Sequence, residues 1–253
     1  MKKVKYWYIG SDIHGDWRPI RNWVVNELKT PREKSGLILL GDVGANYYLN
    51  HRDRELKQKL NKLGLEIYCL RGNHEMRIED AKQYSNYEQV FSVEVDGPIY
   101  TEVGYPHIHY LRDDCDFYHF GDLYTLAIPG AYSPDKDYRL RMGWSWFPNE
   151  QLNLREMERG LNLAAAESFD LILSHTCPFS WEKYVQDLFI SDIEQNNVDK
   201  SMEKFLDEIL IETEYYGHWY FGHFHDDRDI PETKATMLYK KIIPLGEYID
   251  GRN

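Results

Sequence analysis

Short apolar runs recur along the chain, most of them next to a glycine, and they constrain its fold more than any other feature. They are YWYIG (6–10), LILLG (37–41), LEIYCLRG (65–72), LYTLAIPG (123–130), LILSH (171–175) and WYFGH (219–223). Each run has the length of a β-strand, and several are apolar at successive positions, which is typical of strands covered on both faces. The pattern predicts buried sheets with helices outside them.

Helical patterns lie between these runs. We expect helices over 17–29, 53–63 and 199–211, and another that begins at Asn149 and carries Leu154, Met157 and Leu161 on one face. A hairpin-like stretch near 117–128 adds antiparallel pairing, so the fold class predicted is α/β with mixed sheets. Residues 131–148 and 178–198 read as long connections, which in compact domains are often functional.

Composition limits the class of protein. The 253 residues contain no repeat and no Gly/Ser linker, so one domain over 1–253 is expected. No apolar stretch is long enough for a membrane span and the N-terminus lacks a signal-peptide pattern, which predicts a cytoplasmic protein without a membrane partner. A formal net charge of −12 weighs against stable nucleic-acid binding.

Three isolated cysteines argue against a disulfide framework and suit a reducing compartment. Cys177 lies close to His175 in the sequence, so a thiol nucleophile has to be considered. A small buried side chain beside a site is the better supported interpretation.

Residues that bind metals or transfer protons follow or close these apolar runs. They stand in the segments GSDIHGD (10–16), GDVG (41–44), RGNHE (71–75), SHTCP (174–178) and GHFH (222–225). Side chains at i and i+2 of an extended chain project to the same side, so Asp12 with His14, and His223 with His225, can each reach one point. Because loops at strand ends combine a fixed backbone with room for a ligand, these segments predict a shared site.

The ligand types restrict the metal. Carboxylates, imidazoles and one amide oxygen without thiolate suit Mn, Fe, Zn or Ni, with Mn favoured. Seven candidate ligands exceed what one tetrahedral ion needs, so we expect two divalent ions, about 3.5–4 Å apart in sites of this kind.

The series D-x-H, G-D, G-N-H-E, an isolated His and G-H-x-H resembles the calcineurin-like metallophosphoesterase superfamily, over nearly the whole chain. The resemblance implies an α/β/β/α sandwich of two mixed β-sheets with a dinuclear site at their carboxyl edge. It also implies that one metal is bound by Asp12, His14 and His225, and the other by Asn73, His175 and His223, with Asp42 bridging the two. His74 would be the acid or transition-state stabiliser, and Glu75 would orient it.

The activity implied is hydrolysis of phosphomonoesters by in-line attack of a hydroxide that bridges the metals, on a phosphoprotein or a small phosphorylated substrate. The GNHE segment is similar to that of bacterial and phage Ser/Thr-phosphatase-like members, but the Asp-Arg pair usual after the second motif is missing from GDVGANYYL. Residues 130–151 resemble a stretch of bacterial and phage-type members, and Arg139 and Arg141 there are candidates for the phosphate clamp.

Two alternatives remain at the level of sequence. A phosphodiesterase on cyclic nucleotides or nucleic-acid ends would use the same centre, although the histidine in GNHE favours monoesters or dinucleoside polyphosphates. A non-catalytic scaffold of the same fold is disfavoured because an unused cluster of buried polar ligands is costly to retain.

Overall fold

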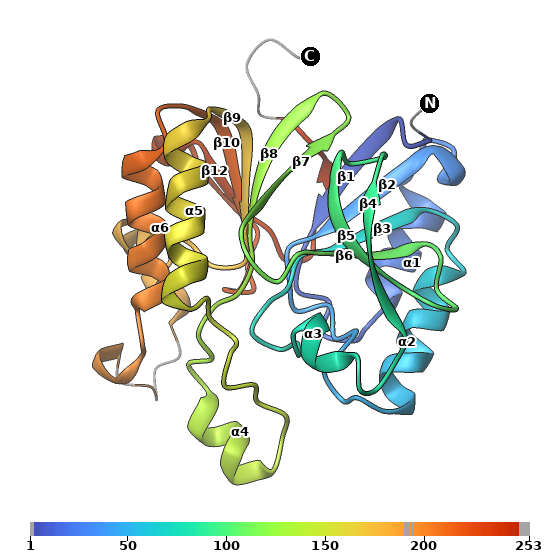
Figure 1. Cartoon of the computed structure of the whole chain (residues 1–253), viewed down its shortest axis with the longest axis horizontal. Helices are drawn as coiled ribbons and strands as arrows, with labels where there is room; N and C mark the ends of the chain where they lie inside the picture. The colour runs from blue at the N-terminus through green and yellow to red at the C-terminus, as the bar shows by residue number, and fades with distance from the viewer. Residues whose placement is uncertain (1–2, 190–192, 194, 248–253) are drawn as a thin grey trace.

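Alternate residues of each central strand belong to different apolar cores. In β2 (Ser35–Leu39), Leu37 and Leu39 pack against the helices, whereas Ile38 packs against the opposite sheet. This period of two is a property of extended backbone, and apolar residues at successive positions therefore require both faces to be covered. The computed structural model, which describes residues 3–189, 193 and 195–247, shows that arrangement (Figure 1).

The first sheet has seven strands in the order β13-β1-β2-β3-β6-β5-β4. Strands β1, β2, β3 and β6 are parallel to one another, while β13, β5 and β4 pair antiparallel. The strand bounds are β1 (Tyr6–Gly10), β2 (Ser35–Leu39), β3 (Glu66–Cys69), β4 (Tyr87–Ser92), β5 (Gly97–Glu102), β6 (Ile108–Leu111) and β13 (Ile243–Pro244).

The second sheet has six strands in the order β11-β12-β10-β9-β8-β7. Its four central strands are parallel, and the expected hairpin is present because β7 and β8 pair antiparallel. The strand bounds are β7 (Asp116–Phe120), β8 (Leu123–Ile128), β9 (Phe169–Ser174), β10 (Tyr216–Phe221), β11 (Arg228–Ile230) and β12 (Ala235–Met237).

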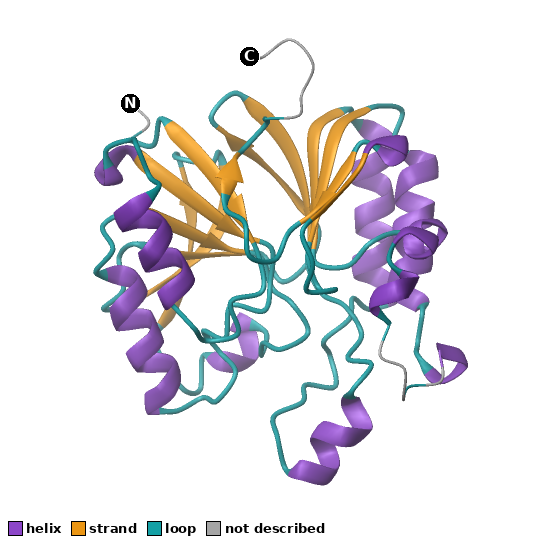
Figure 2. Cartoon of the chain, turned by 180° about the vertical axis from the view of Figure 1, so that it is seen from behind, coloured by secondary structure: helices purple, strands orange, loops and turns teal. Residues whose placement is uncertain are grey.

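Helices cover the outer face of each sheet (Figures 1 and 2). Helices α1 and α2 lie on the first sheet, and α5 and α6 lie on the second. The helix bounds are α1 (Arg18–Asn26), α2 (His51–Asn61), α3 (Ile78–Ala81), α4 (Lys136–Met142), α5 (Leu154–Ala166) and α6 (Ser201–Glu212), with short 3₁₀ helices at Arg32–Lys34, Phe179–Tyr184, Gln186–Leu188, Gln195–Asn197 and Pro231–Thr233. The predicted α/β/β/α sandwich of mixed sheets is confirmed.

The core between the two sheets contains the alternate residues that face away from the helices. Ile9, Tyr68 and Leu70 come from the first sheet, and Leu173 and Tyr220 come from the second. All five are at most 1 % exposed. This buried apolar layer holds the two sheets together and so sets the relative position of the loops that leave their carboxyl edges.

Cys177 is buried in the core between the second sheet and its helices. Burial raises the pKa of its thiol well above the usual value, so the thiolate needed for nucleophilic attack is disfavoured. The interpretation of Cys177 as a small buried side chain is confirmed.

None of the helices within the described residues is both long and apolar enough to cross a membrane.

The N-terminus of α5 differs from the prediction. Asn153, not Asn149, caps the helix: its side chain accepts hydrogen bonds from the backbone N–H groups of Arg155 and Glu156, and Glu156 accepts one from the N–H of Asn153. This reciprocal capping box satisfies donors at the helix start. The Asn149 side chain instead donates a hydrogen bond to Asp80 at 2.8 Å.

The two predicted connections are partly structured. Residues 131–148 contain α4, which projects from the carboxyl edge of the sandwich (Figure 1). Within 178–198, short 3₁₀ helices occupy much of the segment, while residues 190–192 and 194 lie outside the described residues.

The capping box provides a test of the α5 boundary. We expect Asn153→Ala to lower the free energy of unfolding by about 1 kcal/mol, because two backbone donors of the first turn lose their acceptor. Asn149→Ala is the matched control and should change it by much less. Urea denaturation of both variants makes the comparison, and equal effects would contradict the assignment.

Candidate metal centre

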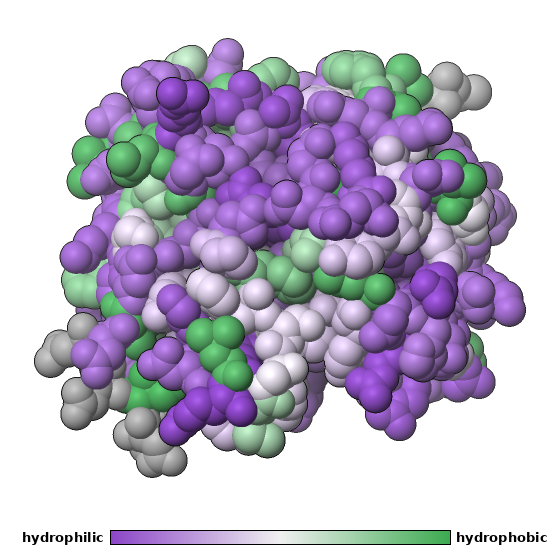
Figure 3. All heavy atoms as spheres, turned by 60° about the horizontal axis from the view of Figure 1, so that its bottom comes forward, coloured by the Kyte–Doolittle hydropathy of each residue, from purple (hydrophilic) through white to green (hydrophobic). Residues whose placement is uncertain are grey.

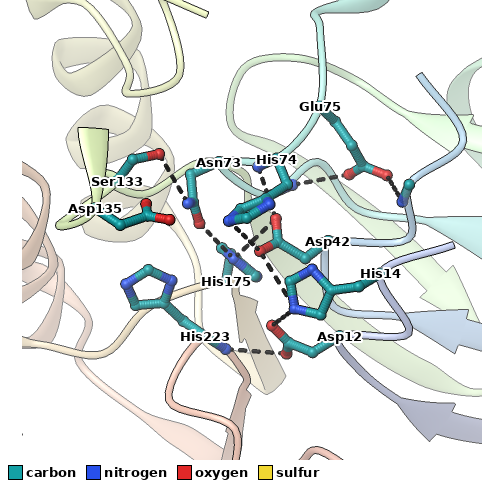
Figure 4. A network of polar contacts seen from close by, with 12 residues as sticks. Asp12, His14, Asp42, Asn73, His74, Glu75, Ser133, Asp135, His175 and His223 are labelled. Carbon is teal, nitrogen blue, oxygen red and sulfur yellow. Dashed lines mark hydrogen bonds and ion pairs between the residues drawn. The ribbon is translucent and has the colours of Figure 1, made fainter. Parts of the chain in front are cut away.

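Five loops meet at the carboxyl edge of the sandwich, three from the first sheet and two from the second. The parallel register places Gly10 beside Leu39 and Leu39 beside Cys69, so the loops after β1, β2 and β3 begin at nearly the same level. The loops after β9 and β10 approach them from the second sheet (Figure 2). The close view in Figure 4 shows their polar side chains pointing toward one another.

The backbone at this site is strained. Asp12, His14, Asp42, His223 and His225 all have positive φ, between 44° and 72°, and they are five of the eight non-glycine residues with positive φ in the described part of the chain. Such conformations cost about 1–3 kcal/mol each and cluster at functional sites. Backbone hydrogen bonds from Asp12 to Gly41 and from His14 to Asp42 hold the first two loops in this geometry.

Two motif glycines are required because carboxylates approach their backbone closely. A Cβ atom on Gly72 would lie 2.1 Å from Oδ1 of Asp42, and one on Gly222 would lie 2.2 Å from Oδ2 of Asp12. Neither carboxylate could keep its place beside a larger residue. The glycines in GNHE and GHFH therefore have a packing role at the site itself.

Asp12, His14 and His225 form one cluster. Oδ1 of Asp12 lies 3.8 Å from Nε2 of His14 and 3.6 Å from Nε2 of His225, and the two imidazole nitrogens are 2.8 Å apart. Oδ2 of Asp12 accepts hydrogen bonds from Ser11 and from the N–H of His223. Oδ1 is buried and has no hydrogen-bond partner among the described residues. Three atoms that could bind a metal ion, one from each residue, thus surround one point. One of them is Oδ1 of Asp12, the oxygen without a hydrogen-bond partner.

Asp42 lies between this cluster and a second group, which consists of Asn73, His175 and His223. Its Oδ1 is 3.4 Å from Nε2 of His175, and its Oδ2 is 3.9 Å from Nε2 of His14. Oδ1 of Asn73 lies 3.0 Å from the same His175 nitrogen, whose ring is also fixed by a contact of 2.6 Å between Nδ1 and the carbonyl of Leu40. The ring of His223 is edge-on to that of His175, with centroids 5.1 Å apart.

The amide of Asn73 is oriented by residues that the sequence analysis did not identify. Its Nδ2 donates to Oγ of Ser133 at 3.0 Å, and that hydroxyl donates to Glu150 at 2.6 Å. Glu150 also accepts from the backbone N–H of Ser133 at 2.8 Å. These contacts turn Oδ1 of Asn73 toward His175. Both lie within residues 130–151, but nothing in that stretch points to their role, because the contact of Ser133 with Asn73 joins segments far apart in the chain.

The charges at the site are mutually compensated. Burial opposes ionisation of Asp42, but His74 and His175 outweigh it and hold the pKa of the carboxyl well below its usual range. Burial alone would lower the pKa of His175, but the Asp42 charge and hydrogen bond raise it to about 9. For His223, burial dominates and lowers the pKa to about 3, which leaves a neutral ring.

His74 borders this centre and contacts the aromatic ring of Tyr47. Its Nε2 is 3.8 Å from Oδ2 of Asp42, and its backbone N–H donates to Oδ1 of Asp42 at 2.8 Å. The Tyr47 ring stacks on it with centroids 5.7 Å apart. Burial lowers the pKa of His74 to about 4, with a further contribution from the positive charge of Arg139.

Glu75 has different partners from those predicted. Its two carboxylate oxygens accept hydrogen bonds from the backbone N–H groups of Gly44 and Gly72, at 3.0 and 3.1 Å. It therefore ties together the loops that carry Asp42 and Asn73, while Tyr47 contacts the ring of His74. Burial raises the pKa of Glu75 to about 7.

The two candidate clamp arginines lie in different environments on α4. Arg139 is fully buried, donates from Nη1 to Ser133 at 2.9 Å, and lies over the ring of Tyr47. Its Nε and Nη2 have no hydrogen-bond partner within the described part of the chain, although Nε lies 3.9 Å from a carboxylate oxygen of Asp135. Arg141 is exposed and donates to the backbone oxygen of Asp137. Of the two, Arg139 is therefore the one that contacts neighbours of the site, Ser133 and Tyr47.

The donor set fits divalent metal ions. The three clusters of closely spaced donors combine Asp12, His14 and His225; His14, Asp42 and His74; and Asp12, Asp42 and His175. Carboxylate oxygens and imidazole nitrogens without thiolates suit ions of intermediate softness. The unpartnered oxygen of Asp12 is accounted for if a cation binds there, because a buried carboxylate oxygen without a partner is otherwise costly.

The chain is similar to known proteins in sequence and in fold. The family model described as calcineurin-like phosphoesterase matches residues 8–227. The crystal structure of TT1561 from Thermus thermophilus is similar in fold, with a TM-score of 0.50 at 12 % identity over 95 % of this chain and 98 % of that one. A protein serine/threonine phosphatase from Saccharomyces cerevisiae aligns with a TM-score of 0.38 at 12 % identity, over 94 % of this chain and 68 % of that one. None of the curated proteins matches the sequence.

The Ser133 contact predicts an effect on metal affinity. We expect Ser133→Ala to weaken Mn²⁺ binding about tenfold or more, because Asn73 loses the acceptor that orients its amide. Ser35→Ala is the matched control: Ser35 is also a buried serine, at the start of β2, where its hydroxyl donates to Pro31. Calorimetric titration with Mn²⁺ measures both. Unchanged affinity in Ser133→Ala would show that Asn73 needs no such support.

Proposed function

This chain belongs to the calcineurin-like phosphoesterase family, and we propose that it is a phosphatase that hydrolyses phosphomonoesters at a centre of two divalent metal ions. The family supports a metal-dependent phosphoesterase in general. The substrate class, the count of ions and the role of each residue are our proposal, which draws its support from the geometry of the site.

One observation carries the proposal: the two oxygens of Asp42 face different groups of donors. Oδ2 is on the side of His14, and Oδ1 is on the side of His175. A carboxylate in this position can bridge two ions. We propose that Asp12, His14 and His225 hold one ion and that Asn73, His175 and His223 hold the other.

A pair of divalent ions, when bound, supplies Lewis acidity toward phosphoryl oxygens and lowers the pKa of water. The donor set suits Mn, Fe, Zn or Ni, and we favour Mn. The protein contributes position: the strained loops and the hydrogen bonds of Asn73 and Asp12 fix the donors before substrate arrives. Such preorganisation is the main contribution of a protein to phosphoryl transfer.

His74 is proposed to act on the leaving group. With its pKa lowered to about 4 by burial, the ring is neutral at pH 7 in the structure described. A neutral imidazole carries one N–H that can donate a hydrogen bond. The sequence leaves two roles for His74, acid and stabiliser of the transition state, and in either role the ring has to present an N–H to the leaving oxygen.

Arg139 is proposed to hold the phosphate. It is buried beside Tyr47 and Ser133, both of which touch residues of the centre, and two of its nitrogens are unused among the described residues. A guanidinium offers parallel N–H groups that match two phosphate oxygens. The substrate is proposed to be a phosphorylated small molecule or a phosphoprotein. The single domain, the cytoplasmic location and the absence of stable nucleic-acid binding stay predictions from sequence.

Substitution of His74 tests the proposed reaction. On Mn²⁺-reconstituted protein, we expect His74→Asn to lower kcat for p-nitrophenyl phosphate by about 100-fold or more, because the N–H that faces the leaving oxygen is lost. Metal content should be unchanged, since His74 is not a proposed ligand.

His119→Asn is the matched control, because His119 lies on β7 beside Asp96, at 3.6 Å. Bis-p-nitrophenyl phosphate is assayed in parallel. Preference for this diester, with little effect of His74→Asn, would replace the proposal with a phosphodiesterase. Metal binding without hydrolysis of either ester would favour a non-catalytic scaffold.

The two arginines of α4 form a second matched pair. We expect Arg139→Lys to raise KM for p-nitrophenyl phosphate about tenfold, because an ammonium cannot make the two parallel hydrogen bonds of a guanidinium. Arg141→Lys should leave KM unchanged, since that side chain is exposed. Steady-state kinetics of both variants decide, and equal KM values would remove Arg139 from the phosphate site.

A further inference from the structure

A pocket of about 560 Å³ opens beside the proposed metal centre. Its inner wall is formed by His14 and His74. The remaining lining comes from two segments: the loop after β2 together with the first turn of α2, with Gly44, Tyr47, Tyr48 and Arg52, and the residues directly after α4, with Gly143, Trp144 and Ser145. In Figure 3, pale and hydrophobic residues run across the middle of the face at which the carboxyl edge comes forward, between hydrophilic flanks.

Planar side chains form one side of this pocket. The ring of Tyr47 stacks on His74, and the ring of Tyr48 is edge-on to Tyr47 with centroids 4.7 Å apart. The guanidinium of Arg52 lies 4.7 Å from the centroid of the Tyr48 ring. These contacts connect the rings in a continuous series from His74 to the rim. Tyr48 is 43 % exposed, so its ring remains open to a ligand.

Trp144 belongs to the part of the lining that comes from residues 131–148, the arm that contains α4. It follows Gly143, which ends α4 in a left-handed conformation, and its backbone N–H donates to the carbonyl of Arg139 at 2.9 Å. Its ring is edge-on to that of Tyr138, with centroids 5.5 Å apart. The backbone is thus anchored while half of the side chain, 51 %, is exposed. An indole with this much exposed surface at a pocket is available for stacking.

The position of the pocket next to His74 indicates which part of a substrate the pocket would hold. A group that assists departure has to lie within hydrogen-bond reach of the leaving oxygen. What fills the space next to His74 is therefore the part of the substrate that leaves. A second hollow beside His74 is smaller, about 190 Å³, and its lining includes Asp42, Asn73 and His223, so it lies over the proposed metal centre itself.

Arg52 adds a polar feature at the rim. Among the described residues it has no carboxylate within ion-pair distance, in a chain whose net charge is −12. Such a guanidinium can donate hydrogen bonds to acceptors on the edge of a bound ring, and the hydroxyl of Ser145 can do the same. The pocket combines ring surfaces with a few donors.

We propose that this pocket binds a planar aromatic group on the leaving side of the phosphoester, with Tyr48 and Trp144 as specificity-determining residues. Two substrate types carry such a ring: aryl phosphates, where it is bonded to the leaving oxygen, and nucleotides, where a sugar intervenes. The inference rests on the proposed phosphomonoesterase activity and names the class of substrate for it.

The test compares substrates that differ by the ring. Phosphotyrosine is paired with phosphoserine, and 5′-AMP with ribose 5-phosphate, all as small molecules with the Mn²⁺-reconstituted protein. Aryl leaving groups are intrinsically more reactive, so the wild-type preference alone is not informative. The decisive quantity is the ratio of kcat/KM for the ring-bearing substrate to kcat/KM for its partner, and how that ratio changes when a pocket residue is substituted. We expect Trp144→Ala to lower the ratio about tenfold in one pair, chiefly through KM, since stacking stabilises ground and transition states alike.

Further variants separate stacking from other effects. Tyr48→Ala should lower the same ratio, whereas Trp144→Phe should keep most of it because a ring is retained. Phe91→Ala, which removes a ring that is 65 % exposed on the edge strand β4, should leave both ratios unchanged. The pair whose ratio falls identifies an aryl phosphate or a nucleotide as the preferred type.

The outcomes distinguish the inference from the function on which it rests. If the wild-type protein hydrolyses these monoesters but neither Trp144→Ala nor Tyr48→Ala changes either ratio, the aromatic pocket is overturned and the phosphatase stands. If the wild-type protein with bound metal hydrolyses p-nitrophenyl phosphate but none of the four, the inference is overturned and the phosphatase stands. If it hydrolyses neither the four nor p-nitrophenyl phosphate, the proposed function fails, and the inference is overturned with it.

Discussion

The carboxylate of Asp42 is the interaction on which the rest of the site depends. It is almost fully buried, and burial alone would make its charge unfavourable. His14, His74 and His175 lie within 3.9 Å of its two oxygens, and His175, whose pKa the Asp42 charge raises to about 9, compensates that charge. The site can keep so many titratable groups close together because each carboxylate has imidazoles or N–H groups as neighbours. The family to which the chain belongs implies cations at the same position, which would compensate the carboxylates further.

Two structural devices hold Asp42 and its neighbours in place. The sandwich sets the approximate position of the site, since the buried apolar layer between the sheets fixes where the five loops begin. The loops give fine position through strained backbone, with left-handed conformations at Asp12, His14 and Asp42, and through glycines that let carboxylates approach. Strain of this kind persists only where the surrounding structure over-determines it. The stability of the sheets therefore supports the geometry of the site.

The proposed substrate side of the site is built differently from the proposed metal side. The donors of the metal side sit directly at strand ends, whereas Ser133, Arg139 and Trp144 come from the arm that contains α4. Ser133 joins the two, because its hydroxyl contacts both Asn73 and Arg139. A change of substrate could therefore arise through residues 131–148 without disturbing the strands, although substitutions at Ser133 would also reach the metal donors.

The sequence by itself determined the layered fold and the gathering of the donors. Period-two burial, strand-length apolar runs and ligand-type residues after each run are local patterns, and parallel strands bring their carboxyl ends to one edge whatever the details of the loops. The tertiary structure alone decided which asparagine caps α5 and which arginine of α4 is buried. It also decided that Glu75 accepts hydrogen bonds from backbone N–H groups rather than from His74. Finally, it decided that Ser133 and Glu150 orient Asn73. Each of these depends on a contact whose geometry is set by the path of a loop or by reciprocal hydrogen bonds, and such contacts leave no periodic signal in the chain.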